Sequence, residues 1–470
     1  MRIPEVSLRK IPLEHASLKG NLGLRAPAAS GLEQTGSFRR APFYIVFTYL
    51  CVTYGFFIAW PINWPIYSEA AWFWLNLYVA ICFSVLALGH RIGLRRPVPP
   101  SETRFNISFL ITLGGIATVL ILIPSSFIYT GNWPWQVFDA LQDQNTAYKN
   151  LQYQLVETEG QRGPLALIRA LAAPLTFAVL PLGIIYWRKL SIVPRLFVFT
   201  SAVSAIIFSV LRGTDREMAD LLMIGGSALL VAMARSDTSF KNLVKQYWKP
   251  ALLVIVFLSV ASSFYTTRKS ERLGGYENRM TVCANTSGIC ADIDAPYVRY
   301  LPVAQRFSIS LFVLSTSSGF YGVYLASEKD FKSTYGFGHS PAMLTIHQIV
   351  TGDDNFIERT YTRRNSDDGW SDENYWSSLI TWIANDVGFP GAVIVLGVLG
   401  YGWARSWRDA TEGNNDAAAV IFCLFMVMLF YLPANNQVFG IYDGYFVFGV
   451  WVFLWMRSRT SRPMMRAKLT

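Results

Sequence analysis

Long apolar runs alternate with shorter polar or charged segments along most of this chain. A helix needs roughly 20 mainly apolar residues to cross the hydrocarbon core of a membrane. By this hydropathy criterion the pattern predicts about ten transmembrane helices. The predicted spans are residues 43–60, 71–88, 107–127, 165–187, 196–211, 218–234, 251–264, 387–404, 417–432 and 442–456.

The composition agrees with a membrane protein. Hydrophobic residues make up 52% of the 470 residues and charged residues only 15%, whereas soluble domains carry about 25% charged residues. The predicted fold class is therefore an all-α polytopic membrane protein, with the lipid bilayer as its main partner.

The distribution of basic residues predicts the orientation. Lysine and arginine residues near the ends of spans are retained on the cytoplasmic side, and here they gather in residues 1–42, in residues 457–470 and in alternate loops. We therefore expect both termini to be cytoplasmic. This topology and attraction to the membrane surface explain the net charge of +10, so no nucleic-acid partner is expected.

The chain divides into segments at the predicted spans. The stretch at 307–325 is also apolar. If it crossed the membrane, the basic tail at 457–470 would lie outside, against the rule that basic segments stay in the cytoplasm. We therefore expect a helix that lies on the membrane surface or dips into it. The segments are a flexible basic arm (1–42), seven helices (43–264) with a periplasmic loop at 129–163, a large periplasmic loop with surface helices (265–386), three helices (387–456) and a basic cytoplasmic tail (457–470).

Two of the five cysteines lie close together in the large outer loop. The spacing of Cys283 and Cys290 suits a small disulfide ring in an oxidising compartment. A zinc site is the weaker interpretation, because no histidine lies near enough to complete the ligands.

A charged turn at 212–217 separates two predicted spans. Charge at this depth is costly in a membrane protein and indicates function. Arg212 and Arg216 form a fork suited to phosphate oxygens. The alternative is that the arginines reach the interface or pair with Asp215 and Glu217. Thr214 and Glu217 match the capping-box pattern for the next helix.

Two further side chains are candidates for acid–base chemistry. His339 stands in a glycine-flanked turn, and an imidazole of this kind suits a general base acting on a sugar hydroxyl; a packing role is the alternative. Asp386 lies where a short outer helix is expected to kink into the span at 387–404. It either caps that span or acts as an acid or base.

Aromatic and charged residues alternate over residues 360–376, among them Arg363, Trp370 and Trp376. Such a mixture suits carbohydrate, and it also suits a membrane-interface belt. The sequence contains neither a phosphate-binding Gly-x-x-x-x-Gly-Lys loop nor a His-Glu-x-x-His pair. We therefore predict no metal site and no cofactor.

These motifs together resemble a known family. A charged turn (212–217) precedes Ser318-Gly319-Phe320-Tyr321-Gly322, Tyr335-Gly336-Phe337-Gly338-His339, Gly369-Trp370, Trp376-Ser377-Ser378-Leu379-Ile380-Thr381 and Asp386-Val387-Gly388-Phe389-Pro390-Gly391. In this order and hydropathy, over roughly the last 270 residues, the chain resembles the Wzy-type oligosaccharide repeat-unit polymerases. The earlier spans match in hydropathy alone.

The resemblance implies a bacterial inner-membrane glycosyltransferase. Such an enzyme moves a growing glycan from undecaprenyl diphosphate to the next lipid-linked repeat unit on the periplasmic side, in O-antigen, capsule or exopolysaccharide synthesis. A chain-length regulator is an expected partner. Two cations, Arg212 and Arg216, would stabilise the leaving diphosphate, with His339 as the base and Asp386 in reserve. Substrate-binding roles would fall to Arg306, Tyr321, Arg363, Trp370 and Trp376.

Other functions compete with this interpretation. An O-antigen ligase has a similar layout but a different acceptor, a lipid A core. A lipid-linked glycan flippase needs charges along a cavity through both leaflets, whereas the charges of this chain cluster outside the spans. A non-enzymatic assembly partner is the third alternative.

Overall fold

The computed structural model describes residues 39–99, 105–157, 159–236, 281–283, 288–372 and 375–460. This part of the chain is helical apart from a two-stranded antiparallel sheet, β1 (Thr281–Cys283) with β2 (Cys290–Asp292). Seven of its helices are long and apolar enough to cross a membrane, as predicted for an all-α polytopic membrane protein. They are α2 (Ala41–Ala59), α3 (Glu69–Arg95), α4 (Ile107–Thr130), α7 (Glu159–Ile185), α8 (Ile192–Leu211), α9 (Arg216–Ala234) and α15 (Leu379–Thr411).

Three of the ten predicted spans are not among these seven helices, so the total of ten stays a prediction. Residues 251–264 lie outside the described residues. The span at 417–432 is α16 (Asp416–Tyr431), which is shorter than a full crossing. The span at 442–456 lies in α17 (Tyr442–Thr460), which is not among the seven long apolar helices.

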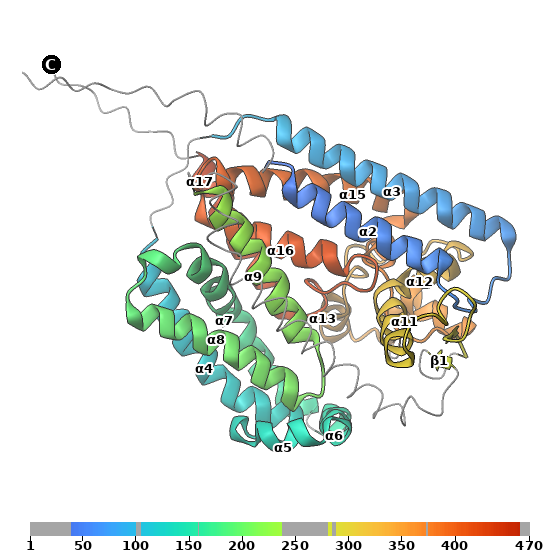
Figure 1. Ribbon diagram of the computed structural model, residues 1–470, viewed down its shortest axis with the longest axis horizontal. Helices are drawn as coiled ribbons and strands as arrows, with labels where there is room; N and C mark the ends of the chain where they lie inside the picture. The colour runs from blue at the N-terminus through green and yellow to red at the C-terminus, as the bar shows by residue number, and fades with distance from the viewer. Residues whose placement is uncertain are drawn as a thin grey trace, which may run out of the picture.

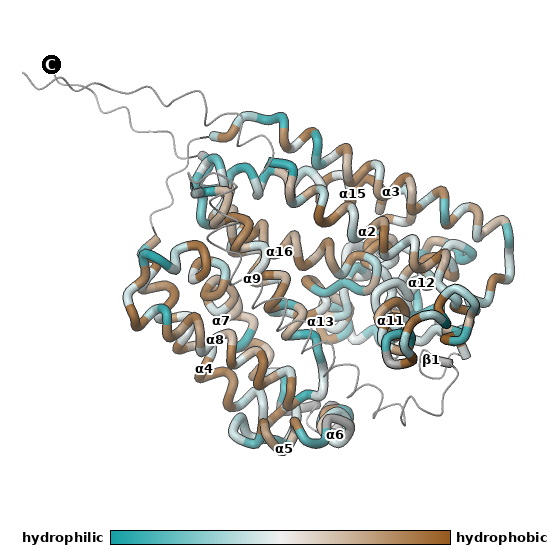
Figure 2. The backbone as a smooth tube through the Cα atoms, in the orientation of Figure 1, coloured by the Kyte–Doolittle hydropathy of each residue, from teal (hydrophilic) through white to brown (hydrophobic). Residues whose placement is uncertain are grey.

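The short helix α16 forms the centre of the protein. All of its residues except Phe430 are buried. It contacts α15 on one side and α7, α9 and α17 on the other, so it lies between a layer formed by α2, α3 and α15 and a bundle formed by α4, α7, α8 and α9 (Figure 1). Hydrophobic residues run along the long helices, and hydrophilic residues concentrate at the helix ends and connections (Figure 2).

Helices α3 and α15 pack with their backbones in contact. A Cβ atom added to Gly400 would lie 2.2 Å from the carbonyl oxygen of Leu86, and one added to Gly89 would lie 2.0 Å from that of Gly397. Small residues let membrane helices approach this closely and gain van der Waals contact. This packing fixes α15 against α3.

The predicted break near the outer end of α15 is present. Gly388 has φ +68° and ψ 173° inside the helix, a conformation that glycine adopts at little cost, and Pro390 follows it. The break comes two residues after the kink expected at Asp386. Residues 379–387 therefore form a separate outer segment that ends beside the large loop.

The apolar stretch at 307–325 forms two helices instead of one. Helices α11 (Val303–Ser317) and α12 (Gly319–Ser327) are bent by 43° at a short break, as in a broken span or a re-entrant segment. Residues 319–326 of α12 are all buried, and α12 contacts α3 and α15. Thus α12 is packed within the protein and does not lie on its surface.

Short helices fill the rest of the two loops. In the first loop, η1 (Pro134–Gln136), α5 (Val137–Gln142) and α6 (Gln144–Glu157) cover the ends of α4 and α8. The large loop contains α13 (Pro341–Thr351), η3 (Asp354–Arg359), α14 (Tyr361–Arg364) and η4 (Asn365–Asp368); η2 (Trp187–Lys189) joins α7 to α8. The predicted disulfide between Cys283 and Cys290 is formed and joins β1 to β2.

Replacement of Gly400 by alanine tests the contact between α3 and α15. Because the new Cβ would meet backbone atoms, which cannot move aside, Gly400→Ala should destabilise the protein by about 1–3 kcal/mol. Gly55→Ala in α2 is the matched control, since nothing lies within 4 Å of its Cβ position. Melting temperatures in detergent should fall only for Gly400→Ala; equal melting temperatures would contradict this packing.

Candidate functional site

The carboxylate of Asp386 holds a loop of the outer region in place. Its Oδ1 accepts hydrogen bonds from the backbone N–H groups of Gly336 (3.0 Å) and Gly338 (2.7 Å) and from the hydroxyl of Thr334. Its Oδ2 accepts one from the backbone N–H of His339 (2.9 Å). The side chain is only 9% exposed. A carboxylate with this many donors is a satisfied buried charge.

The loop has the glycines that this arrangement requires. Gly336 has φ +90°, and a Cβ on Gly338 would lie 2.1 Å from Thr334 Oγ1. The residue before Asp386 reinforces the contact, because Asn385 Nδ2 donates to the carbonyl of Gly338 (2.8 Å). The outer segment of α15 and the loop therefore form one unit.

His339 connects Asp386 to α17. Its Nδ1 lies 2.8 Å from Asp386 Oδ2, and its Nε2 lies 2.7 Å from the hydroxyl of Tyr445. Because an ionised carboxylate only accepts hydrogen bonds, we assign the proton of the neutral imidazole to Nδ1. The lone pair of Nε2 then accepts from Tyr445. A base oriented by a third group is the arrangement that activates hydroxyl nucleophiles.

The charged turn between α8 and α9 gives its two arginines different surroundings. Arg212 forms an ion pair with Glu217 and stacks over the ring of Phe208 at 5.3 Å, as in the pairing alternative. The capping-box prediction is wrong, because α9 begins at Arg216 with Asp215 as its N-cap, and the Thr214 hydroxyl donates to the Glu217 carboxylate (3.1 Å).

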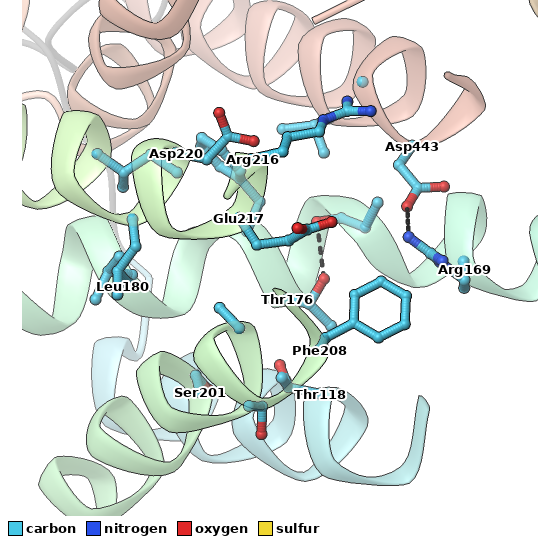
Figure 3. Close-up of a pocket in the computed structure, with 18 of the residues that line it drawn as sticks. Thr118, Arg169, Thr176, Leu180, Ser201, Phe208, Arg216, Glu217, Asp220 and Asp443 are labelled. Atoms are coloured by element: carbon cyan, nitrogen blue, oxygen red, sulfur yellow. Dashed lines mark hydrogen bonds and ion pairs between the residues drawn. The ribbon is translucent and has the colours of Figure 1, made fainter. Parts of the chain in front are cut away.

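Arg216 faces a cavity of about 350 Å³ between α4, α7, α8, α9, α16 and α17. Most of the lining is apolar, and the charged side chains gather on one side of the cavity (Figure 3). The guanidinium of Arg216 donates to the Gln437 carbonyl at 3.4 Å, and Gln437 Nε2 donates to Asp220 (2.9 Å). The cavity thus combines an apolar body with a charged rim.

A second arginine lies on the same rim. Arg169, in α7, forms an ion pair with Asp443 of α17 (3.0 Å) and stacks over the ring of Tyr129 at 5.3 Å. Both Arg169 and Asp443 line the cavity beside Arg216 (Figure 3). Two guanidinium groups from different helices therefore face one apolar space.

The segment between α16 and α17 joins the cavity to the His339 cluster. Asn436 Nδ2 donates to the carbonyl of His339 (2.6 Å), while the next residue, Gln437, contacts Arg216. The first turn of α17 repeats this connection, since Asp443 pairs with Arg169 and Tyr445 contacts His339. The imidazole and the arginine rim are thus neighbours.

The remaining predicted residues lie elsewhere in the outer region. Arg306 binds Asp294 (2.8 Å) and the carbonyl of Leu301 (2.6 Å), so it ties down residues 293–301. Arg363 pairs with Asp372 (3.1 Å) at a second cavity lined also by Trp382. None of these residues lines the first cavity.

The predicted aromatic residues differ in their exposure. Tyr321 is buried and its hydroxyl donates to the carbonyl of Pro65 (3.0 Å). Trp370 is buried and donates to the carbonyl of Trp376 (3.3 Å), whereas the Trp376 side chain is 44% exposed. Glycan contacts by these residues stay a prediction, and Trp376 alone of the three is open to solvent.

Sequence reasoning missed several residues of the site. Arg169 and Asp443 fall inside the predicted spans at 165–187 and 442–456, where a charge in an apolar run is itself a signal of function. Asp220 lies in the predicted span at 218–234 and carries the same signal. Gln437 and Tyr445 gave no signal, because only the fold brings them to Arg216 and His339.

Comparisons of the chain with protein-family models, curated protein sequences and solved structures found no match. Among the described residues, no group of three or more histidine, cysteine, aspartate or glutamate side chains is placed to hold a metal ion. What the site can do chemically follows from an oriented imidazole, two arginines and an apolar cavity.

Substitution of Asp386 by asparagine tests its role in holding the loop. An amide has nearly the same size as the carboxylate, but its NH2 group would point at backbone N–H groups that are themselves donors. Asp386→Asn should therefore lower the free energy of unfolding by about 1–3 kcal/mol. Asp367→Asn, at an exposed position, is the control. Thermal unfolding in detergent should separate the two variants; a wild-type melting temperature for Asp386→Asn would refute this role.

Proposed function

We propose that the protein is a glycosyltransferase that polymerises oligosaccharide repeat units carried on undecaprenyl diphosphate, on the periplasmic side of a bacterial inner membrane. The observation that carries the proposal is that the His339–Asp386 pair is linked, through Asn436 and Gln437, to Arg216 at the rim of an apolar cavity. The cations suit a diphosphate, the cavity suits an isoprenoid chain, and the imidazole suits a hydroxyl nucleophile.

The cavity fits the lipid part of such a substrate. Its volume, about 350 Å³, lies at the lower end of ligand pockets, which are roughly 300–1,000 Å³. It would therefore take the isoprene units next to the diphosphate, with the rest of the chain in the bilayer. Apolar walls favour these units through the hydrophobic contacts that bury them.

The charged rim fits the leaving group. Transfer breaks the bond between the anomeric carbon of the growing glycan and the diphosphate, and the bonding electrons leave with the diphosphate. Preorganised cations stabilise such developing charge in a site with little water. Arg216 lies close enough to interact electrostatically with Glu217 and Asp220 and donates to the carbonyl of Gln437. It would bind an oxygen of the diphosphate. Arg169 would exchange its Asp443 partner for a phosphate oxygen.

The imidazole fits the attacking side of the reaction. A hydroxyl of the incoming lipid-linked repeat unit attacks the anomeric carbon and loses its proton, which His339 accepts. Asp386 keeps Nδ1 protonated in the resting state and stabilises the imidazolium that forms. The acceptor keeps its own lipid diphosphate, so each cycle lengthens the chain by one unit.

The location and partners follow from the same proposal. The Cys283–Cys290 disulfide fits an oxidising compartment such as the periplasm, and the basic arm and tail fit the cytoplasm. The substrates are undecaprenyl-diphosphate-linked glycans of O-antigen, capsule or exopolysaccharide synthesis. A chain-length regulator is the expected protein partner.

Gel analysis of lipid-linked glycans tests the proposal in cells that lack this chain. Wild type should restore a ladder, while His339→Ala and Arg216→Ala should leave single repeat units, because loss of a general base costs about 100-fold to 10,000-fold in rate.

Arg195→Ala, at the opposite end of α8 from the charged turn, is the matched control and should restore the ladder. All variants are compared at equal membrane abundance. Long lipid-linked chains that never reach a final acceptor in the deletion strain would indicate a ligase. A complete ladder from both site variants would exclude these residues and the polymerase mechanism.

A further inference from the structure

The hydroxyl of Tyr445 lies directly against the imidazole of His339, the predicted base. In the tautomer assigned above, it donates its single proton to His339 Nε2 over 2.7 Å. Because Asp386 already binds Nδ1 at 2.8 Å, Nε2 is the only nitrogen of this imidazole with a lone pair, and Tyr445 occupies it. A substrate hydroxyl therefore reaches the base only by displacing Tyr445 or through it.

The surroundings of Tyr445 hold its ring in place. The ring packs against that of Phe439, with centroids 5.0 Å apart, and lies 5.8 Å from the imidazole. Its neighbours in α17, Asp443 and Gly444, line the cavity that carries Arg216. One helical turn thus presents Asp443 to the cavity rim and Tyr445 to the base.

A phenol in this position has the groups that a proton relay needs. Its O–H donates to Nε2, and its oxygen keeps lone pairs that accept a hydrogen bond from a second hydroxyl. We propose that Tyr445 is a catalytic residue that relays the proton of the acceptor hydroxyl to His339. The proposal rests on the proposed glycosyl transfer and names a residue for its proton path.

The proton movements balance in one step. As the acceptor oxygen bonds to the anomeric carbon, its proton passes to Tyr445 Oη, and the proton of Tyr445 passes to His339 Nε2. The bond to the diphosphate breaks, and its electron pair leaves with the diphosphate. Tyr445 ends neutral, and the imidazolium of His339 faces the carboxylate of Asp386. Return of that proton to solvent through the same path restores the resting state.

The test uses the full-length protein reconstituted with a synthetic polyprenyl-diphosphate-linked repeat unit. Tyr445→Phe keeps the ring and removes the relay, so kcat should fall by about 100-fold, the lower limit typical of general acid–base catalysis, with KM for the lipid substrate unchanged. Tyr442→Phe, one turn earlier in α17, is the matched control and should keep wild-type rates.

A double variant separates a relay from a structural role. Residues that act as one unit have non-additive effects, so Tyr445→Phe should change the residual rate of His339→Gln by less than about twofold. Tyr445 would only support the fold if the rate losses of the two single variants multiply in the double variant. A changed KM or a lowered melting temperature of Tyr445→Phe would mean the same. A rate for Tyr445→Phe equal to or above wild type would mean that the hydroxyl blocks the base, and it would overturn the relay. Absence of polymer from wild type would instead refute the proposed function.

Discussion

The carboxylate of Asp386 is the group on which the candidate site depends. It stands at the end of the outer segment of α15, just before the break at Gly388. From there it binds the backbone of the loop at Gly336, Gly338 and His339. The same carboxylate orients the imidazole of His339. The outer segment of α15 thereby positions the side chain of His339, which stands on a loop.

The charged side chains of the helix bundle are tolerated because most of them are paired with one another. Arg212 has Glu217, Arg169 has Asp443, and Asp220 has Gln437. Each pairing joins groups whose isolated burial would be costly. Of these charged residues, Arg169, Glu217, Asp220 and Asp443 line one cavity, and cavities inside the bundle are where ionisable residues of membrane proteins are expected. The proposed substrate would exchange some of these internal partners for phosphate oxygens.

The sequence predicted the parts of this structure that depend on local pattern. Apolar runs located the long helices, the cysteine spacing predicted the disulfide, and the kink expected at Asp386 lies within two residues of the break in α15. His339 and Asp386 were both selected, yet their 2.8 Å contact spans 47 residues of chain and was not predictable from spacing. Tyr445 is 106 residues from His339, so only the packing of α17 reveals it. The bend between α11 and α12 was missed for the same reason, because tertiary contacts with α3 and α15 bury α12.

We propose that this site transfers a glycan from one lipid diphosphate to another. The most direct measurement is mass spectrometry of the products formed by the purified protein in liposomes that contain only single lipid-linked repeat units. We expect lipid-linked products of two and more units together with one released polyprenyl diphosphate for each bond formed, without any nucleotide sugar. Single units that remain unchanged, or that merely cross the bilayer, would contradict it.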